Sequence, residues 1–207
     1  MILHPVKRNP NINQNIINMK QKLLFYFFIL MLFFCTNCYR KSITALQQEK
    51  GKSQTCLLQL LQQIDSLSFF GEFDPLISKN YIQITRDFAS TYPEDNMSAE
   101  FLYKAGLIAM TVAKESENSE EKDFYCREAF DIFDDILRIY PEFEGAKNCI
   151  LNKGVIYDDI LHNYDTAELY YREFIARYPT DSLARNMELY LQFLGKSPEE
   201  ILAEKNN

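Results

Sequence analysis

Three Tyr-Pro dipeptides punctuate the chain, and each follows an apolar segment in the same register. A large apolar residue stands five positions before each proline, namely Phe88, Ile136 and Phe174. Because proline lacks the amide hydrogen that a helix interior needs, each dipeptide predicts a helix that ends at the same point of a repeated unit. The three dipeptides are Tyr92-Pro93, Tyr140-Pro141 and Tyr178-Pro179.

Small residues recur in step with these dipeptides. Gly106 and Gly154 each lie thirteen residues after the proline of a Tyr-Pro dipeptide. In the segment that follows each glycine, an aromatic residue lies four positions after an alanine. We expect the small residues to let paired helices approach closely and the aromatic rings to fill the space between them. The two pairs are Ala129 with Phe133 and Ala167 with Tyr171.

The remaining pattern is helical. Only 6 Gly and 7 Pro occur among 207 residues, and no Asn-Gly or Asp-Gly dipeptide is present to join two strands of a hairpin. Between residues 55 and 70, apolar side chains recur at spacings of three and four, as one face of a helix requires. We therefore predict an all-α fold with eight helices. They cover Gln54–Phe70, Pro75–Thr91, Asn96–Glu115, Glu120–Ile139, Glu142–Leu161, Asp165–Arg177, Asp181–Leu194 and Pro198–Lys205.

Residues 76–195 resemble the tetratricopeptide repeat, a unit of about 34 residues with two antiparallel helices. The resemblance rests on the small residue of the first helix, the alanine and aromatic of the second, and the closing proline. Successive prolines lie 48 residues apart from Pro93 to Pro141 and 38 from Pro141 to Pro179, and the family's tryptophan is missing. The charged stretch 114–122, KESENSEEK, lengthens the first interval and indicates an extended loop or a helix overrun.

This resemblance implies a right-handed solenoid fragment built from stacked antiparallel helix hairpins. In the family, the first helices of successive repeats line a concave groove that receives peptides or partner helices. For this chain it therefore implies a protein or peptide partner, with no cofactor and no metal. Tyr103 and Leu107 replace the residues with which some members clamp a terminal carboxylate, so that mode of recognition is not expected. The implied groove residues, whose alternative is a merely solvated surface, are Glu100, Tyr103, Asn148, Asn152, Asn186 and Tyr190.

The amino terminus has the features of an export signal. Residues 23–34 read LLFYFFILMLFF, an apolar run about 18 Å long as a helix, whereas a bilayer core is about 30 Å thick. Lys20 and Lys22 directly precede this run, as in the charged region of a signal peptide. Met19 stands directly before the lysines, so we expect it to be the true start.

Two cysteines follow the apolar run in the sequence Cys35-Thr36-Asn37-Cys38, which resembles a bacterial lipoprotein signal. In that family the cysteine thiol receives a diacylglycerol and becomes the new amino terminus after cleavage. Small or short side chains precede Cys38, whereas Leu32 and two phenylalanines precede Cys35. The resemblance therefore favours Cys38 as the lipidated residue and leaves Cys35 as the alternative. A further alternative is an uncleaved anchor.

The lipoprotein resemblance implies a protein of the Gram-negative cell envelope, anchored by its lipid to the outer membrane and facing the periplasm. An anchored adaptor that faces the cytoplasm is the alternative. We expect a scaffold for protein-protein interactions that helps to assemble outer-membrane proteins or coordinates envelope machinery. The expected organisation is a leader and signal over residues 1–38, a flexible tether over 39–53 and a repeat domain over 54–207.

The charge of the chain argues against nucleic acid as a partner. None of the 29 acidic residues and four of the 22 basic residues precede residue 39, so the remainder has 18 basic and 29 acidic side chains and a formal charge of −11. Because nucleic-acid binding depends on neutralising phosphates with Lys and Arg, an acidic domain of this kind is a poor candidate.

Histidines and cysteines offer little chemistry. His162 is the one histidine after the leader, and we expect it at a helix end, where it interacts with the helix dipole. Cys56, Cys126 and Cys149 lack the spacing of metal ligands and stand among apolar residues, so we expect buried thiols. In an exported protein, Cys126 and Cys149 could also pair as a disulfide.

Two groups of aspartates are the remaining candidates for catalysis. Their helical spacing and the lack of a glycine turn argue against a calcium loop, and they predict a solvated acidic face. We therefore expect no enzyme. The alternative is an accessory subunit or a hydrolase-like domain that uses the paired carboxylates. The groups are Asp131, Asp134 and Asp135, and Asp158 and Asp159 with Asp165.

Overall fold

The computed structural model describes residues 44–205, and every regular element within that range is helical. The chain divides into an amino-terminal unit that ends at Gly51 and a second unit that begins at Lys52. Residues 44–51 of the first unit and residues 52–69 of the second are helical. The other elements are α2 (Pro75–Thr91), α3 (Ser98–Glu115), α4 (Ser119–Ile139), α5 (Ala146–Val155), the π-helical turn η1 (Ile156–Ile160), α6 (Tyr164–Arg177), α7 (Ser182–Tyr190) and α8 (Pro198–Lys205).

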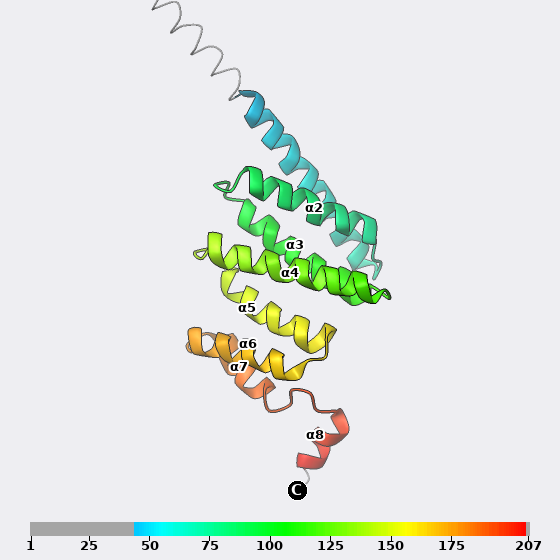
Figure 1. Ribbon diagram of the computed structural model, residues 1–207, viewed down its shortest axis with the longest axis vertical. Helices are drawn as coiled ribbons and strands as arrows, with labels where there is room; N and C mark the ends of the chain where they lie inside the picture. Colours follow the sequence, from blue (N-terminus) through cyan, green and yellow to red (C-terminus); the bar gives the residue numbers. More distant parts are fainter. Residues whose placement is uncertain (1–43, 206–207) are drawn as a thin grey trace, which may run out of the picture. The chain divides into compact units, whose positions relative to one another are not determined.

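Helices α2 to α7 each pack against the next helix in chain order (Figure 1). Because only short turns connect them, consecutive helices run antiparallel and form hairpins. Their buried side chains form a larger core cluster, which extends from Leu57 to η1, and a smaller one between α5, α6 and α7. The predicted all-α stack of helix hairpins is confirmed for the described part of the chain.

The two glycines of the repeat pattern lie at close contacts between paired helices. A Cβ atom added to Gly106 on α3 would lie 2.5 Å from Cε1 of Phe133 on α4. A Cβ atom added to Gly154 on α5 would lie 2.6 Å from Cε1 of Tyr171 on α6. Carbon atoms without a bond between them normally stay about 3.5–4.0 Å apart, so a side chain at either position would overlap the ring. The predicted pairing of small residue and ring is confirmed in both hairpins.

The three Tyr-Pro dipeptides form the same turn. Tyr92, Tyr140 and Tyr178 cap α2, α4 and α6 with φ of −128°, −125° and −129° and ψ of 58°, 53° and 55°. In each turn the tyrosine N–H donates to the carbonyl of the residue four positions earlier, and its own carbonyl accepts from the residue three positions later. The same backbone geometry therefore reverses the chain at each hairpin end. The accepting carbonyls belong to Phe88, Ile136 and Phe174.

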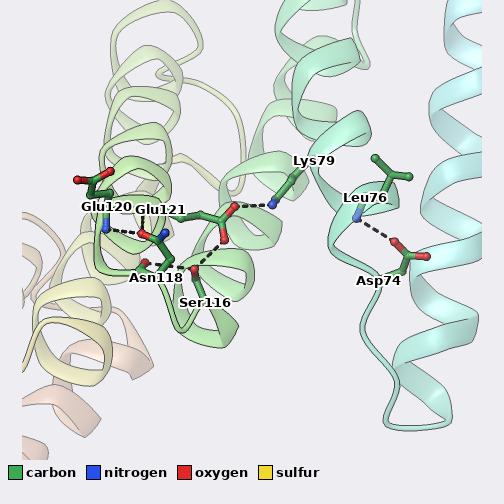
Figure 2. A network of polar contacts seen from close by, with 7 residues as sticks. All are labelled: Asp74, Leu76, Lys79, Ser116, Asn118, Glu120 and Glu121. Carbon is green, nitrogen blue, oxygen red and sulfur yellow. Dashed lines mark hydrogen bonds and ion pairs between the residues drawn. The ribbon is translucent and has the colours of Figure 1, made fainter.

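Polar side chains fix the start of α2 and α4 (Figure 2). The carboxylate of Asp74 accepts from the N–H of Leu76 at 2.8 Å, and the amide oxygen of Asn118 accepts from the first turn of α4 at 2.9 Å. Beside this cap, Glu121 joins two helices, since its carboxylate binds Lys79 Nζ of α2 at 2.5 Å and Ser116 Oγ at 2.8 Å. The two caps satisfy free amides of a helix start, and Glu121 connects α4 with α2 and with the end of α3.

Ion pairs and a contact between aromatic rings also connect alternate helices of the stack. Arg86 of α2 pairs with Glu128 of α4 at 3.3 Å, and the ring of Phe130 on α4 lies 6.3 Å from that of Tyr170 on α6. On the other layer, Lys114 of α3 pairs with Asp159 of η1 at 2.6 Å. Helices α2, α4 and α6 thus form one layer, while α3, α5 and α7 form the other and present the face that the sequence predicts for binding.

Several boundaries differ from the predicted ones. Residues 44–53, expected in a flexible tether, are helical, because Ala45 to Lys50 are mostly strong helix formers even though they bury no apolar face. The stretch 114–122 is largely a helix overrun, since only residues 116–118 separate α3 from α4. Helix α7 ends at Tyr190 rather than Leu194, and the residues that follow it form turns.

Candidate functional site

A cleft of about 550 Å³ crosses the α3, α5 and α7 layer near the amino-terminal ends of these helices. Three of the predicted groove residues line it: Glu100 and Tyr103 of α3 and Asn148 of α5. Phe143, from the Tyr-Pro turn between α4 and α5, forms part of its wall, and its ring lies 5.9 Å from that of Tyr103. We call this surface the Asn148 cleft.

Asn148 has an amide oxygen that lacks a partner. The Oδ1 atom is buried and accepts no hydrogen bond from the described part of the chain, whereas buried polar atoms in folded proteins are almost always paired. An unpaired buried acceptor costs about 1–3 kcal/mol, so a donor placed against this atom would be favoured. Lys147, next in the chain, is already engaged at the edge of the cleft, with its Nζ atom 2.5 Å from Asp181.

This ion pair changes the proton affinity of both partners. The ammonium of Lys147, together with the N–H of Leu183, holds the pKa of Asp181 below its usual value, and the carboxylate in turn raises the pKa of Lys147. Both groups therefore remain charged at neutral pH. Asp181 also caps α7, since its Oδ1 accepts from the N–H of Leu183 at 2.9 Å.

A second cleft of about 570 Å³ adjoins the carboxyl-terminal end of α5. Asn152 and Tyr190, two further predicted groove residues, line this cleft. Asn152 also donates from Nδ2 to the hydroxyl of Tyr103 at 3.4 Å, so a hydrogen bond connects the two clefts. The carboxylate of Asp158, from η1, is part of its wall, and we call it the Asp158 cleft.

Two tyrosines donate to the same oxygen of Asp158. The hydroxyl of Tyr171 lies 3.0 Å from Oδ2, and that of Tyr190 lies 2.5 Å from it. Burial is the main cause that raises the pKa of both phenols, to about 12 for Tyr190, and the negative charge of Asp158 adds to it. The phenols therefore stay protonated and act as donors over the physiological range.

Asn186 differs from the other predicted groove residues. It is exposed on α7 and lines neither the Asn148 cleft nor the Asp158 cleft. Phe143 and Asp181 are not among the predicted groove residues, and Asp158 is predicted only as part of an acidic group. Phe143 could have been found, because it stands where the other two Tyr-Pro turns carry the capping residues Asp95 and Asp181.

Three of the six aspartates that were considered for catalysis form ion pairs. Asp134 binds Lys153 Nζ at 2.5 Å, and Asp135 binds Arg138. Asp159 pairs with Lys114. Within residues 44–205, no group of three or more His, Cys, Asp or Glu side chains is arranged to hold a metal ion.

The histidine and the cysteines have structural surroundings. His162 lies two residues beyond the end of η1 with a φ of 51°, and its Nδ1 is 3.1 Å from the carbonyl oxygen of Asp158, as expected for a helix end. Cys126 and Cys149 are buried free thiols, and burial raises the pKa of both, to about 12 for Cys149. Cys56 is exposed rather than buried, because the neighbouring Leu57 occupies the core-facing side of that helix.

The predicted lipidation residues Cys38 and Cys35 and the apolar run before them lie outside the described residues. Among the helices of the described range, none is both long and apolar enough to cross a membrane. No protein-family model matches the chain, and comparisons with curated proteins and with solved structures give no significant match.

Proposed function

We propose that this protein is a helical-repeat scaffold that binds an extended segment of another protein along the α3, α5 and α7 layer. One observation carries the proposal: five of the six residues expected in the groove line two clefts that a hydrogen bond connects. Clefts that combine aromatic side chains with a few polar groups are typical binding sites. The repeated turns and close helix contacts supply the rigid support that such a surface needs.

The side chains of the clefts suit an extended peptide. The buried Oδ1 of Asn148 can accept from a peptide N–H, and the amide of Asn152 can pair with a peptide carbonyl. The rings of Tyr103, Phe143 and Tyr190 offer apolar area for the side chains of the bound segment. The acidic excess of the chain favours approach by a basic partner.

The amino-terminal sequence supports a proposed location in the cell envelope. The short apolar run and Cys38 support attachment by a lipid to the envelope of a Gram-negative bacterium, at the outer membrane and facing the periplasm. A scaffold in that position would bring its partner to the membrane surface, as in the assembly of outer-membrane proteins or the coordination of envelope machinery.

Replacing Asn148 and Asn152 with alanine tests the groove. A hydrogen bond contributes about 0.5–1.5 kcal/mol, so the loss of both, about 1–3 kcal/mol, should weaken binding about 5- to 150-fold. The fold should not suffer, because among residues 44–205 Asn148 Oδ1 has no hydrogen-bond partner and the side chain of Asn152 makes one long hydrogen bond. The measurement is crosslinking of the full chain in its native envelope, followed by quantification of the captured proteins and by thermal melting of the purified variant.

Asn186→Ala is the matched control, since it removes the same amide from the same layer outside both clefts. It should leave the captured proteins unchanged. If the double variant captures the same proteins in the same amounts as the parent, the groove does not bind them. Recovery of its binding at high salt would instead assign the loss to charge repulsion.

A further inference from the structure

Within the part of the chain that the structure describes, the carboxylate of Asp158 has no cationic partner. Its residue is partly buried, and both tyrosine hydroxyls bind Oδ2, so Oδ1 has no hydrogen bond among the described residues. The neighbouring Asp159 is compensated by Lys114, whereas no Lys or Arg of residues 44–205 forms an ion pair with Asp158. A partly buried carboxylate gains most from an opposite charge that completes its coordination.

The surroundings of this carboxylate match a long basic side chain. Leu151, Val155 and Met187 supply an apolar wall for an alkyl stem, and the rings of Tyr164 and Tyr190, both about 40% exposed, border the cleft. Lysine and arginine combine such a stem with a charged head, and their heads are attracted to aromatic faces. A neutral apolar side chain would fill the same space but leave Asp158 unpaired.

The chain already holds one of its own lysines in this way. Lys153 Nζ lies 2.5 Å from the carboxylate of Asp134, 5.0 Å from the ring centre of Tyr170 and 5.8 Å from that of Phe130. The side chain of this lysine is only 12% exposed. A carboxylate and two aromatic rings, Tyr170 and Phe130, therefore bind a basic side chain on α5. The Asp158 cleft likewise has a carboxylate and aromatic rings but no lysine.

The first hairpin lacks these components, which sets the cleft apart from the repeated packing. Counting from the equivalent glycines Gly106 and Gly154, the position of Asp158 corresponds to Met110 of α3. Helix α3 continues regularly through that position, whereas α5 passes into the π-helical turn η1, which carries Asp158. Single π-helical turns occur frequently at functional sites. The carboxylate is thus a local addition and not a part of the common repeat.

We propose that the Asp158 cleft is a subsite for a lysine or arginine side chain of the bound segment. The head group binds Oδ1 of Asp158 beside the rings of Tyr164 and Tyr190, and the stem lies along Leu151 and Val155. This inference rests on the proposed function, because it specifies one residue of the segment that the groove receives. It gives the scaffold a charge preference at a defined point.

The test titrates the full chain in detergent micelles with Nα-acetyl-arginine methylamide and with its lysine counterpart. The chain has only two histidines, so the imidazole NMR signal of His162, which lines the cleft, reports binding. The citrulline analogue is the neutral match to arginine, with ionic strength balanced by sodium chloride. We expect saturable shifts for both basic probes and an affinity for the citrulline analogue about tenfold weaker or worse, because hydrogen bonds to charged groups are the strong ones.

Asp158→Asn keeps an oxygen that accepts from both tyrosines but removes the charge, so it should abolish the difference between arginine and citrulline. Asp131→Asn changes the net charge equally at an exposed position of α4 and should retain the difference. Equal shifts with both probes, no saturation, or a preference that survives in Asp158→Asn would each overturn the subsite.

The two proposals fail separately. If the arginine probe does not bind but partner capture still depends on Asn148 and Asn152, the subsite is rejected and the groove is retained as the binding surface. If the arginine probe binds in a manner that depends on Asp158, but partner capture does not change when both asparagines are replaced, the cation site is supported. The groove is then refuted as the place where the partner binds.

Discussion

Replacing Gly154 with alanine tests whether the close helix contact determines the repeat. The new Cβ atom would lie 2.6 Å from Cε1 and 2.8 Å from Cδ1 of Tyr171, which are ring atoms in the core. The ring cannot easily move aside, because Tyr171 is 2% exposed and its hydroxyl is bound to Asp158. Helix α5 or α6 would have to shift instead.

Two opposing effects decide the size of the change. Alanine is preferred to glycine in a helix interior by about 1 kcal/mol, which favours the variant. Overpacking of a core typically costs about 1–3 kcal/mol, and the two ring contacts are well within the overlap distance. We expect the overlap to dominate, so the free energy of unfolding should fall about 1–3 kcal/mol below that of an unhindered glycine-to-alanine change.

Gly51 provides that unhindered reference. It is helical, and a Cβ atom added there meets nothing within 4 Å. Gly51→Ala should therefore raise stability or leave it unchanged, while Gly154→Ala lowers it. Urea unfolding followed by circular dichroism measures both, and the midpoint and slope separate stability from a change in unfolding cooperativity.

A second substitution makes the test specific to the ring. In Gly154→Ala combined with Tyr171→Leu, the smaller side chain relieves the overlap, so the loss should be smaller than the sum of the two single losses. If Gly154→Ala stabilises the protein as much as Gly51→Ala does, or if the double variant shows strict additivity, the helices do not meet at this glycine and the reasoning is refuted.

Three further predictions concern other parts of the chain. Ala167→Trp should destabilise the last hairpin by about 1–3 kcal/mol or more, because Ala167 is 0% exposed; an unchanged melting temperature would contradict this placement. The fold raises the pKa of Tyr190 from 10.0 to about 12, so its contribution to stability is complete below pH 10 and declines as the pH rises towards 12. The urea midpoint of Tyr190→Phe should therefore fall less steeply than that of the parent between pH 10 and pH 12. Cys38→Ala should abolish incorporation of labelled lipid, whereas loss in Cys35→Ala alone would place the anchor at Cys35.

Much of the fold could be predicted because its determinants are local. Each Tyr-Pro turn is determined by a proline at the end of a single helix. The contacts of Gly106 and Gly154 involve residues at fixed positions in the sequence relative to those turns. Because the same residue types recur at the same positions in each repeat, the pattern is unlikely to arise by chance. The helix over residues 44–53 was missed because it buries no apolar stripe, and intrinsic helix propensity without a stripe is a weak signal.

The candidate site was less predictable, because it depends on contacts between distant residues. The family resemblance assigned Tyr190 to the binding face, but nothing near it in the sequence indicates that its hydroxyl binds Asp158, 32 residues earlier. The π-helical turn that carries Asp158 differs from a continued α-helix in its backbone hydrogen bonds, and the residue types in the segment do not predict this difference. Asn148 was assigned to the groove, yet its unpaired oxygen follows only from packing around α5.

The differences between the hairpins are as informative as their agreement. Asp95 and Asp181 both accept from a backbone N–H two residues later, which stabilises the turn after each Tyr-Pro. Phe143 stands at the equivalent place and cannot accept such a bond; its ring covers Gly145 instead and borders the Asn148 cleft. Because Phe143 cannot cap the helix that follows it, this turn lacks the stability that the two aspartates supply. Within residues 44–205, Asp158 on the adjoining η1 also has no ion pair to balance its charge. Both departures from the repeat lie at the clefts, where contacts with a partner can offset the stability that the isolated fold forgoes.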